Sequence, residues 1–90
     1  MNAPSAAVKD DMLKRLRRIE GQVRGVQKMI EEDRECNDVI QQLAAIRSAV
    51  HQANLALVRD YACRCLLEAD DESSAEQRVD SLVNVLSKIP

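Results

Sequence analysis

The chain has very few of the residues that favour β-strands or tight turns. Tyr61 is its only aromatic residue, and glycine and proline occur twice each among 90 residues. Ala, Leu, Glu, Gln and Arg are frequent instead and favour helix, so the composition predicts an all-α protein. No apolar run reaches the roughly 20 residues that cross a bilayer. Met1–Lys9 also lacks the basic start and apolar core of a signal peptide. We therefore expect a single cytoplasmic domain over residues 1–90, without a membrane partner and with residues 1–8 flexible.

Cysteine and histidine are scarce, with three cysteines and one histidine. Three cysteines in a chain without a secretion signal do not form a disulfide framework, and metal or redox chemistry is favoured instead. The chain has no Cys-x-x-Cys motif, no histidine near a cysteine and no strand-based scaffold. These absences argue against a thiol redox enzyme or a sulfur carrier. We expect no enzymatic activity and no required cofactor.

The net charge of −2 conceals an uneven distribution. Residues 9–28 contain seven basic and three acidic side chains, whereas residues 68–80 contain six acidic side chains and one arginine. A basic element on an otherwise acidic chain can bind a polyanion while the rest of the protein stays soluble. The charge pattern therefore indicates a nucleic-acid partner for the N-terminal third.

Apolar residues recur at helical spacing in three segments. The first stripe runs from Met12 to Ile30 in steps of four and three, and we place Asp10 and Asp11 near the start of its helix. No glycine or proline interrupts 36–67, which predicts one long helix of about 48 Å. A capping box, Ser73 to Glu76, precedes a short third helix. The apolar residues of that helix are Val79, Leu82, Val83, Leu86 and Ile89.

The predicted long helix has a consequence for assembly. A compact domain of this length has a radius of gyration of only about 12 Å. A helix of about 48 Å cannot be covered by the remainder of such a chain. We therefore expect other subunits to cover its apolar face, so that the oligomer is part of the fold.

One face of the first predicted helix is basic. A solvated face is the ordinary explanation, but opposite charges at i,i+4 are scarce there. Gly21 and Gly25 also lie on this face, each at a cost of roughly 1 kcal/mol in helix stability. Positions without side chains among arginines would let the backbone approach a phosphate chain. Two alternatives fit less well. No glycine-containing turn separates two short helices, which argues against a helix-turn-helix. A helical adaptor protein that does not bind DNA would leave the basic face unexplained. The basic side chains on this face are Lys14, Arg17, Arg18, Arg24 and Lys28.

Two of the cysteines lie at the ends of the long helix. Cys36 begins it, where the helix dipole favours a thiolate, and Cys65 is about 43 Å further along. They cannot meet within one subunit, but antiparallel packing of two long helices would place Cys36 of one beside Cys65 of the other. The alternative is that they are ordinary apolar cysteines. Cys63 points to nearly the opposite side of the helix from Cys65, so we do not assign it to the dithiol site. His51 is more than about 20 Å along the helix from both Cys36 and Cys65, so it can serve neither.

Two segments resemble a known family. Residues 15–26, RLRRIEGQVRGV, resemble the first helix of the copper-sensitive operon repressor (CsoR) family. Cys36, residues 40–47 (IQQLAAIR) and Cys65 resemble its second helix. The resemblance extends from about Leu13 to Leu86.

This resemblance implies a fold and a partner. Members are three-helix protomers in a homotetramer, a dimer of antiparallel dimers, and they repress promoters without a helix-turn-helix. Basic residues of their first two helices contact operator DNA. The family's first-helix arginine corresponds to Arg15, whereas position 52, basic in some members, is Gln52 here. The candidate DNA-binding residues are Lys14, Arg15, Arg17, Arg18, Arg24, Lys28 and Arg47.

The resemblance also indicates which effectors the chain can sense, because each branch of the family has its own effector-binding residues. Copper-sensing members bind Cu(I) through two cysteines and a histidine four residues before the second one. Cys36 and Cys65 match those cysteines, but Tyr61 replaces the histidine, as in the persulfide-sensing (CstR-like) branch. Nickel- and cobalt-sensing members need several histidines, and this chain has only His51. Formaldehyde-sensing members have proline directly after the initiator, where this chain has Asn2.

From these residues we expect a repressor that responds to sulfane-sulfur donors. The Cys36 thiolate would attack the sulfane sulfur, and Cys65 of a second subunit would resolve the product into a crosslink. The modified tetramer would bind operator DNA more weakly. The alternative is a Cu(I)-sensing repressor that uses Cys36 and Cys65 as its metal ligands.

Overall fold

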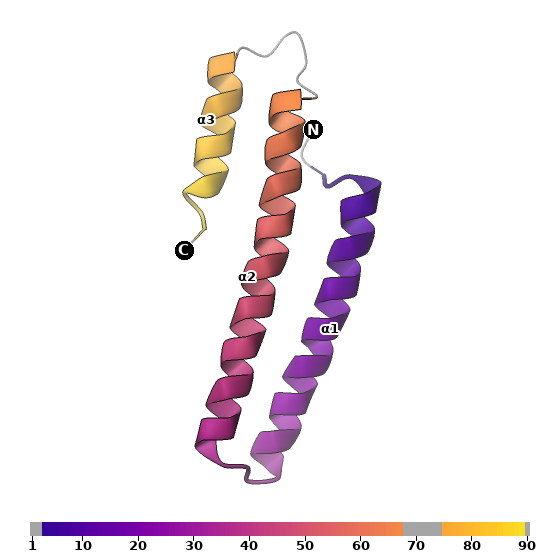
Figure 1. Cartoon of the computed structure of the whole chain (residues 1–90), viewed down its shortest axis with the longest axis vertical. Helices are drawn as coiled ribbons and strands as arrows, with labels where there is room; N and C mark the ends of the chain where they lie inside the picture. Colours follow the sequence, from indigo (N-terminus) through magenta and orange to yellow (C-terminus); the bar gives the residue numbers. More distant parts are fainter. Residues whose placement is uncertain (1–2, 68–74, 90) are drawn as a thin grey trace.

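The computed structural model describes residues 3–67 and 75–89. These residues form α1 (Ala6–Glu31), α2 (Cys36–Leu67) and α3 (Ala75–Leu86), and no strand occurs among them (Figure 1). The all-α class and the three-helix protomer are confirmed. The long central helix has the predicted bounds.

The start of α1 differs from the prediction. The helix begins at Ala6 rather than near Asp10, because Ser5 caps it with φ −62° and ψ 160° and its hydroxyl accepts a hydrogen bond from the Val8 N–H at 3.3 Å. No acidic residue lies in the first turn. A serine at the N-cap therefore determines where α1 starts, and residues 6–8, expected to be flexible, belong to the helix.

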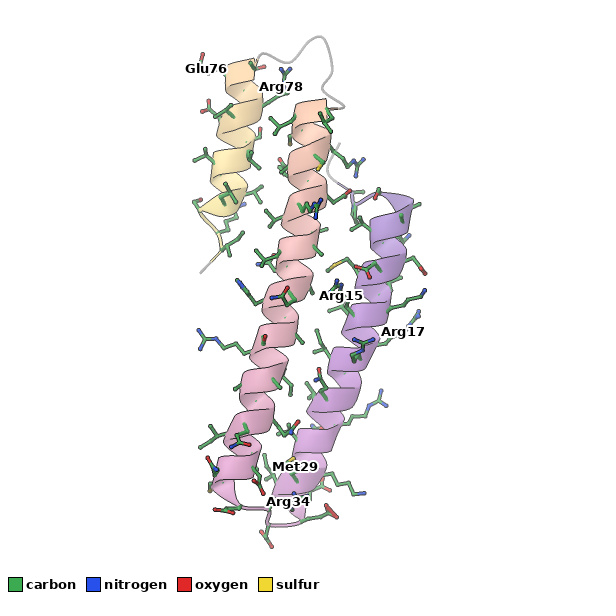
Figure 2. The ribbon with its side chains drawn as sticks, in the orientation of Figure 1. Arg15, Arg17, Met29, Arg34, Glu76 and Arg78 are labelled. Atoms are coloured by element: carbon green, nitrogen blue, oxygen red, sulfur yellow. The ribbon has the colours of Figure 1, made fainter. Side chains whose placement is uncertain are left out.

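A tight turn joins α1 to α2. Asp33 adopts the left-handed conformation with φ 56°. Its N–H donates to the carbonyl oxygen of Ile30 at 3.2 Å, and the N–H of Arg34 donates to that of Met29 at 2.9 Å. This pair of bonds is a Schellman motif with aspartate at the position that usually holds glycine. Figure 2 shows Met29 and Arg34 at this end of the molecule.

The three helices run alternately up and down, with α2 between the other two (Figure 1). α1 packs along α2 for most of its length, and α3 packs beside the C-terminal half of α2. α3 ends at Leu86, so Ile89 lies beyond the helix to which the sequence pattern assigned it. The predicted capping box involves Ser73, which lies outside the described residues.

The part of the chain that the structure describes has almost no closed core. Among residues 3–67 and 75–89, Val26 and Ala53 are the buried apolar residues, whereas thirteen large apolar side chains are exposed. The chain measures 58 × 25 × 13 Å with a radius of gyration of 17.6 Å, against about 12 Å for a compact domain of this length. Across residues 3–67 and 75–89, no helix is long and apolar enough to span a membrane. The apolar faces of the long helices are therefore left uncovered by the chain itself.

Candidate functional site

The basic face of α1 is exposed along the helix. Arg17, Arg18, Arg24 and Lys28 are all exposed, and within the described ranges none has an ion pair or a side-chain hydrogen bond. Figure 2 shows Arg15 and Arg17 emerging from the same stretch of α1. Unpaired cations on a rigid helix are available for phosphate groups, so this face (Arg17, Arg18, Arg24 and Lys28) can bind a polyanion.

Two further basic residues of α1 are already paired. Lys14 Nζ lies 3.1 Å from Asp10 Oδ2, and Arg15 Nε lies 2.8 Å from Asp11 Oδ2. The expectation that i,i+4 partners are scarce on the basic face is therefore wrong for Lys14. The side chains of Lys14 and Arg15 are 70% and 40% exposed, so these pairs are screened by water and contribute little to stability. A phosphate could replace either carboxylate.

Gly21 and Gly25 do not serve packing within the chain. Both are exposed, and a Cβ atom added to either would meet no atom within 4 Å. Their φ angles are negative, so neither needs the freedom of glycine. Within the described chain the two glycines lower helix stability without a compensating interaction. They leave open backbone beside Arg18 and Arg24, as the prediction of close DNA approach requires.

α2 contributes one candidate basic residue. Arg47 is exposed and, in the part of the chain that the structure describes, has no ion pair. Gln52, one and a half turns later, is also exposed but neutral. Arg47 thus lies on a separate helix from the basic face of α1.

The two candidate sensing cysteines are free and lie far apart. Cys36 is the first residue of α2 and is exposed, whereas Cys65 is in the last turn and half-buried. Their separation along the axis is about 43 Å. Among residues 3–67 and 75–89, no group of three or more His, Cys, Asp or Glu side chains could hold a metal ion. A single chain therefore does not bring the two thiols together.

Tyr61 forms a small cluster with Cys65 and Ser81. Its phenol is hydrogen-bonded to the Cys65 thiol and to the Ser81 hydroxyl, which belongs to α3. The hydrogen bond with Cys65, together with desolvation, raises the pKa of the Tyr61 phenol above its usual 10.0, and the Ser81 hydrogen bond opposes the shift. The phenol therefore remains protonated at neutral pH. It offers Cys65 an O–H donor rather than a phenolate ligand.

The other two candidate ligands lie elsewhere on α2. Cys63 is exposed while Cys65 is half-buried, as expected for residues two positions apart on a helix. His51 is exposed near the middle of α2. Neither joins the Tyr61 cluster.

Sequence reasoning missed a polar network at the same end of α2. Asp60 and Arg64 form an i,i+4 ion pair of 3.8 Å. Asp60 accepts hydrogen bonds from Ser5, and Arg64 donates one to the carbonyl oxygen of Ala3. The i,i+4 spacing was readable from the sequence, but the contact with Ser5 depends on how α1 packs against α2. The role of Ser81 was missed for the same reason, because it comes from α3.

The chain is similar to known repressors over almost its whole length. Residues 8–88 match the family model described as metal-sensitive transcriptional repressor. The copper-sensing transcriptional repressor CsoR of Bacillus subtilis is 40% identical over 88 residues, which cover 98% of this chain and 87% of that protein.

Two solved structures have the same fold. The copper-sensing repressor CsoR with Cu(I) from Geobacillus thermodenitrificans has a TM-score of 0.82 and 40% identity, covering 98% of this chain and 92% of that one. The nickel-responsive transcriptional regulator InrS has a TM-score of 0.82 and 34% identity, covering 88% and 89%. Two of these relatives are named as copper-sensing and one as nickel-responsive, so the comparisons favour the Cu(I) alternative and give no support to persulfide sensing.

Proposed function

The chain belongs to the family of metal-sensitive transcriptional repressors, and we propose from this that it is a cytoplasmic, Cu(I)-responsive repressor. Its basic face binds operator DNA, and binding of Cu(I) to Cys36 and Cys65 weakens that binding. The observation that carries the proposal is the placement of two free thiols at opposite ends of one continuous helix.

The donor set fits Cu(I). Thiolates are soft ligands that select Cu(I), and Cys36 and Cys65 would supply two of them. Tyr61, at the position of the family's histidine, is a hard oxygen donor whose raised pKa keeps it protonated. Cys36 and Cys65 would therefore hold the metal, while the Tyr61 hydroxyl hydrogen-bonds to the Cys65 sulfur. When bound, Cu(I) supplies a crosslink between the two sulfurs.

The site requires two subunits. Antiparallel packing of two α2 helices would bring Cys36 of one chain beside Cys65 of the other. The exposed apolar side chains of α2, among them Ile40, Leu43 and Val50, would supply the contact. The accessible surface of 7087 Å² supports this assembly, since a compact monomer of this mass exposes about 5,300 Å². We propose a homotetramer made of two such dimers.

Assembly can be tested with one pair of variants. Leu43→Glu places a charge on the apolar face, whereas Gln42→Glu places the same charge on a neighbouring exposed position. Light scattering should give a tetramer for the wild type and for Gln42→Glu, and a smaller species for Leu43→Glu. A monomeric wild type at micromolar concentration would overturn both the assembly and the shared site.

The response to the effector follows from differential affinity. An effector shifts the equilibrium only if the effector-bound tetramer binds DNA less well than the free one. Joining Cys36 to Cys65 fixes the end of one α2 against the start of another. Because α1 packs along α2, linking the two α2 helices changes the position of one subunit's basic face relative to that of the other. The phosphate contacts of Arg17, Arg18, Arg24 and Lys28 then no longer match the operator.

The experiment is a titration of labelled operator DNA, followed by fluorescence anisotropy. Stoichiometric Cu(I) should release DNA from the wild type and from Cys63→Ser. Cys36→Ser and Cys65→Ser should bind DNA normally and stay bound. Cys63→Ser is the matched control because Cys63 is also on the last turns of α2 but exposed. A wild type that keeps its DNA in Cu(I) would overturn the proposal.

A second candidate effector is a sulfane-sulfur donor, and the replacement of the family's histidine by Tyr61 favours it. The Cys36 thiolate would attack the terminal sulfur of a persulfide, releasing a thiol and leaving Cys36 persulfide. The partner's Cys65 thiolate would then attack the inner sulfur of that group and release hydrosulfide. Two thiols are oxidised to a disulfide, and the sulfane sulfur is reduced to sulfide. DNA release by polysulfide but not by Cu(I), with a crosslinked dimer on a non-reducing gel, would identify this effector.

A further inference from the structure

The start of α1 is bound to the end of α2 by Asp60. The N–H of Ser5 donates to Asp60 Oδ2 and its Oγ–H donates to Asp60 Oδ1, both at 3.2 Å. The two residues are 55 positions apart in the chain. Both carboxylate oxygens therefore accept from one residue at the beginning of the basic helix.

Arg64 adds a second contact to the same segment. Its guanidinium donates to the carbonyl oxygen of Ala3 and lies 3.8 Å from Asp60 Oδ2. The side chains of Arg64 and Asp60 are only 18% and 13% exposed, whereas those of the three other described ion pairs are 40–70% exposed. Water and salt screen this pair less, so its charges interact more strongly than those on the helix surfaces.

The contact also stabilises the first turn of α1. The Ser5 hydroxyl that donates to Asp60 accepts from the Val8 N–H at 3.3 Å, and the Ser5 carbonyl accepts from the Lys9 N–H at 2.8 Å. Asp60 thus orients the residue that caps the helix. A shift of Asp60 would disturb the cap and release the first turn of α1.

Asp60 and Arg64 directly precede the two residues of the sensing end, Tyr61 and Cys65. They belong to the same helical turns, so a displacement of Cys65 moves the ion pair as well. A pocket of about 180 Å³ also joins these elements, since its lining includes Pro4, Tyr61, Arg64 and Val85 of α3. The N-terminal segment therefore touches the structure that the effector would alter.

We infer that residues 3–5, together with Asp60 and Arg64, form a latch that transmits the state of Cys65 to α1. This inference rests on the proposed function. With free thiols the latch is closed and holds the basic helix in its DNA-binding position. Joining Cys65 to a second subunit's Cys36 shifts the last turns of α2 and opens the latch. Opening the latch frees the start of α1 from the end of α2, so the continuous helix that carries the basic face can shift relative to α2.

Hydrogen exchange of the full-length protein tests the latch. Asp60→Asn removes the charge and one acceptor, and the amides of Val8 and Lys9 should then exchange about fivefold faster. Asp38→Asn is the matched control, because Asp38 forms an exposed i,i+4 pair with Arg34 at 3.7 Å on the same helix. It should leave the exchange of Val8 and Lys9 unchanged. Equal exchange in Asp60→Asn and the wild type would overturn the latch.

Operator binding supplies the second readout. Asp60→Asn should bind Cu(I) within about twofold of the wild type, while the ratio of its operator affinities without and with Cu(I) falls about tenfold. Ser5→Gly keeps a tolerated N-cap, leaves α2 intact and removes the hydroxyl donor, so it should lower the ratio as well. If Cu(I) weakens operator binding equally in the wild type and in Asp60→Asn, the latch is overturned but the proposed function stands. A wild type that ignores both Cu(I) and polysulfide would overturn the proposed function instead.

Discussion

Cys36 and Cys65 lie at opposite ends of the same unbroken helix, about 43 Å apart along its axis. Thiol sensing that uses both cysteines must therefore involve two chains. The exposed apolar side chains of α2 offer a surface for the proposed contact between chains, since only two apolar residues are buried among those that the structure describes. The proposed DNA-binding face, the local structure and the proposed shared site can each be tested separately.

DNA binding should depend on the basic face of α1. Replacing Arg18 or Arg24 with Ala removes an exposed cation that has no partner within the described ranges. Operator affinity should fall, and the slope of log affinity against log salt should decrease by about 1 for each phosphate that the variant no longer neutralises. Lys88→Ala, at an exposed position beyond α3, should change neither quantity. An unchanged salt slope in Arg18→Ala and Arg24→Ala would move the DNA contact to Arg15 and Arg47.

Replacing a glycine of α1 should change stability and DNA binding in opposite directions. Gly25→Ala fills open space, so it should raise the free energy of unfolding by up to about 1 kcal/mol. If the backbone approaches DNA at this position, the same variant should bind the operator more weakly. Denaturation at fixed protein concentration and anisotropy measure the two effects. A more stable variant with undiminished operator affinity would show that Gly25 is not near DNA.

The α1–α2 turn should tolerate glycine better than its native residue. Asp33 has φ 56°, a conformation that disfavours residues with a Cβ atom. Asp33→Gly should raise the free energy of unfolding by about 1 kcal/mol. Glu32→Gly is the control, because Glu32 has φ −90° and gains nothing from glycine. Chemical denaturation of both variants distinguishes them, and equal changes would argue against the left-handed turn.

The titration of Tyr61 reports on its contact with Cys65. The pKa of Tyr61 is raised, so its neutral form is favoured in the folded protein. The stability from this contact is fully present below pH 10.0, the usual pKa, and is lost as the pH rises through the folded value. Tyr61 is the only aromatic residue, so phenolate absorbance follows it alone. Cys65→Ala should lower the midpoint, and an unchanged midpoint would contradict the hydrogen bond.

The sequence predicted those parts of the fold that depend on local periodicity. The absence of Gly and Pro over Cys36–Leu67 predicted one continuous α2, because nothing there interrupts helix propagation. The polar stretches 31–35 and 68–74, which interrupt the apolar pattern, indicated where the helix begins and ends. The start of α1 was missed, since Ser5 acts as a cap only when the following residues are helical and Asp60 orients it. A pattern of apolar residues contains no information on such a contact.

The candidate site was predictable in its chemistry but not in its surroundings. Cysteine and arginine are recognisable by residue type and spacing, and Cys36, Cys65 and Arg18 could be proposed directly. The hydrogen bond of Tyr61 with Ser81 joins two helices whose packing the sequence does not specify. The pairing of Lys14 with Asp10 follows from their i,i+4 spacing, but Asp10 was expected at the start of the helix rather than beside the basic face.

Mixed tetramers test the shared site most directly. Cys36→Ser and Cys65→Ser subunits, each carrying a different affinity tag, are refolded together and the doubly tagged tetramers are isolated. An antiparallel pair of one of each has one complete site, formed by Cys65 of the first and Cys36 of the second, and one site with no thiol. We expect high-affinity Cu(I) binding and DNA release to be absent from each pure variant and to return in the mixed tetramers. Mixed tetramers that form but neither bind Cu(I) tightly nor release DNA would contradict a site shared between Cys36 and Cys65 of two subunits.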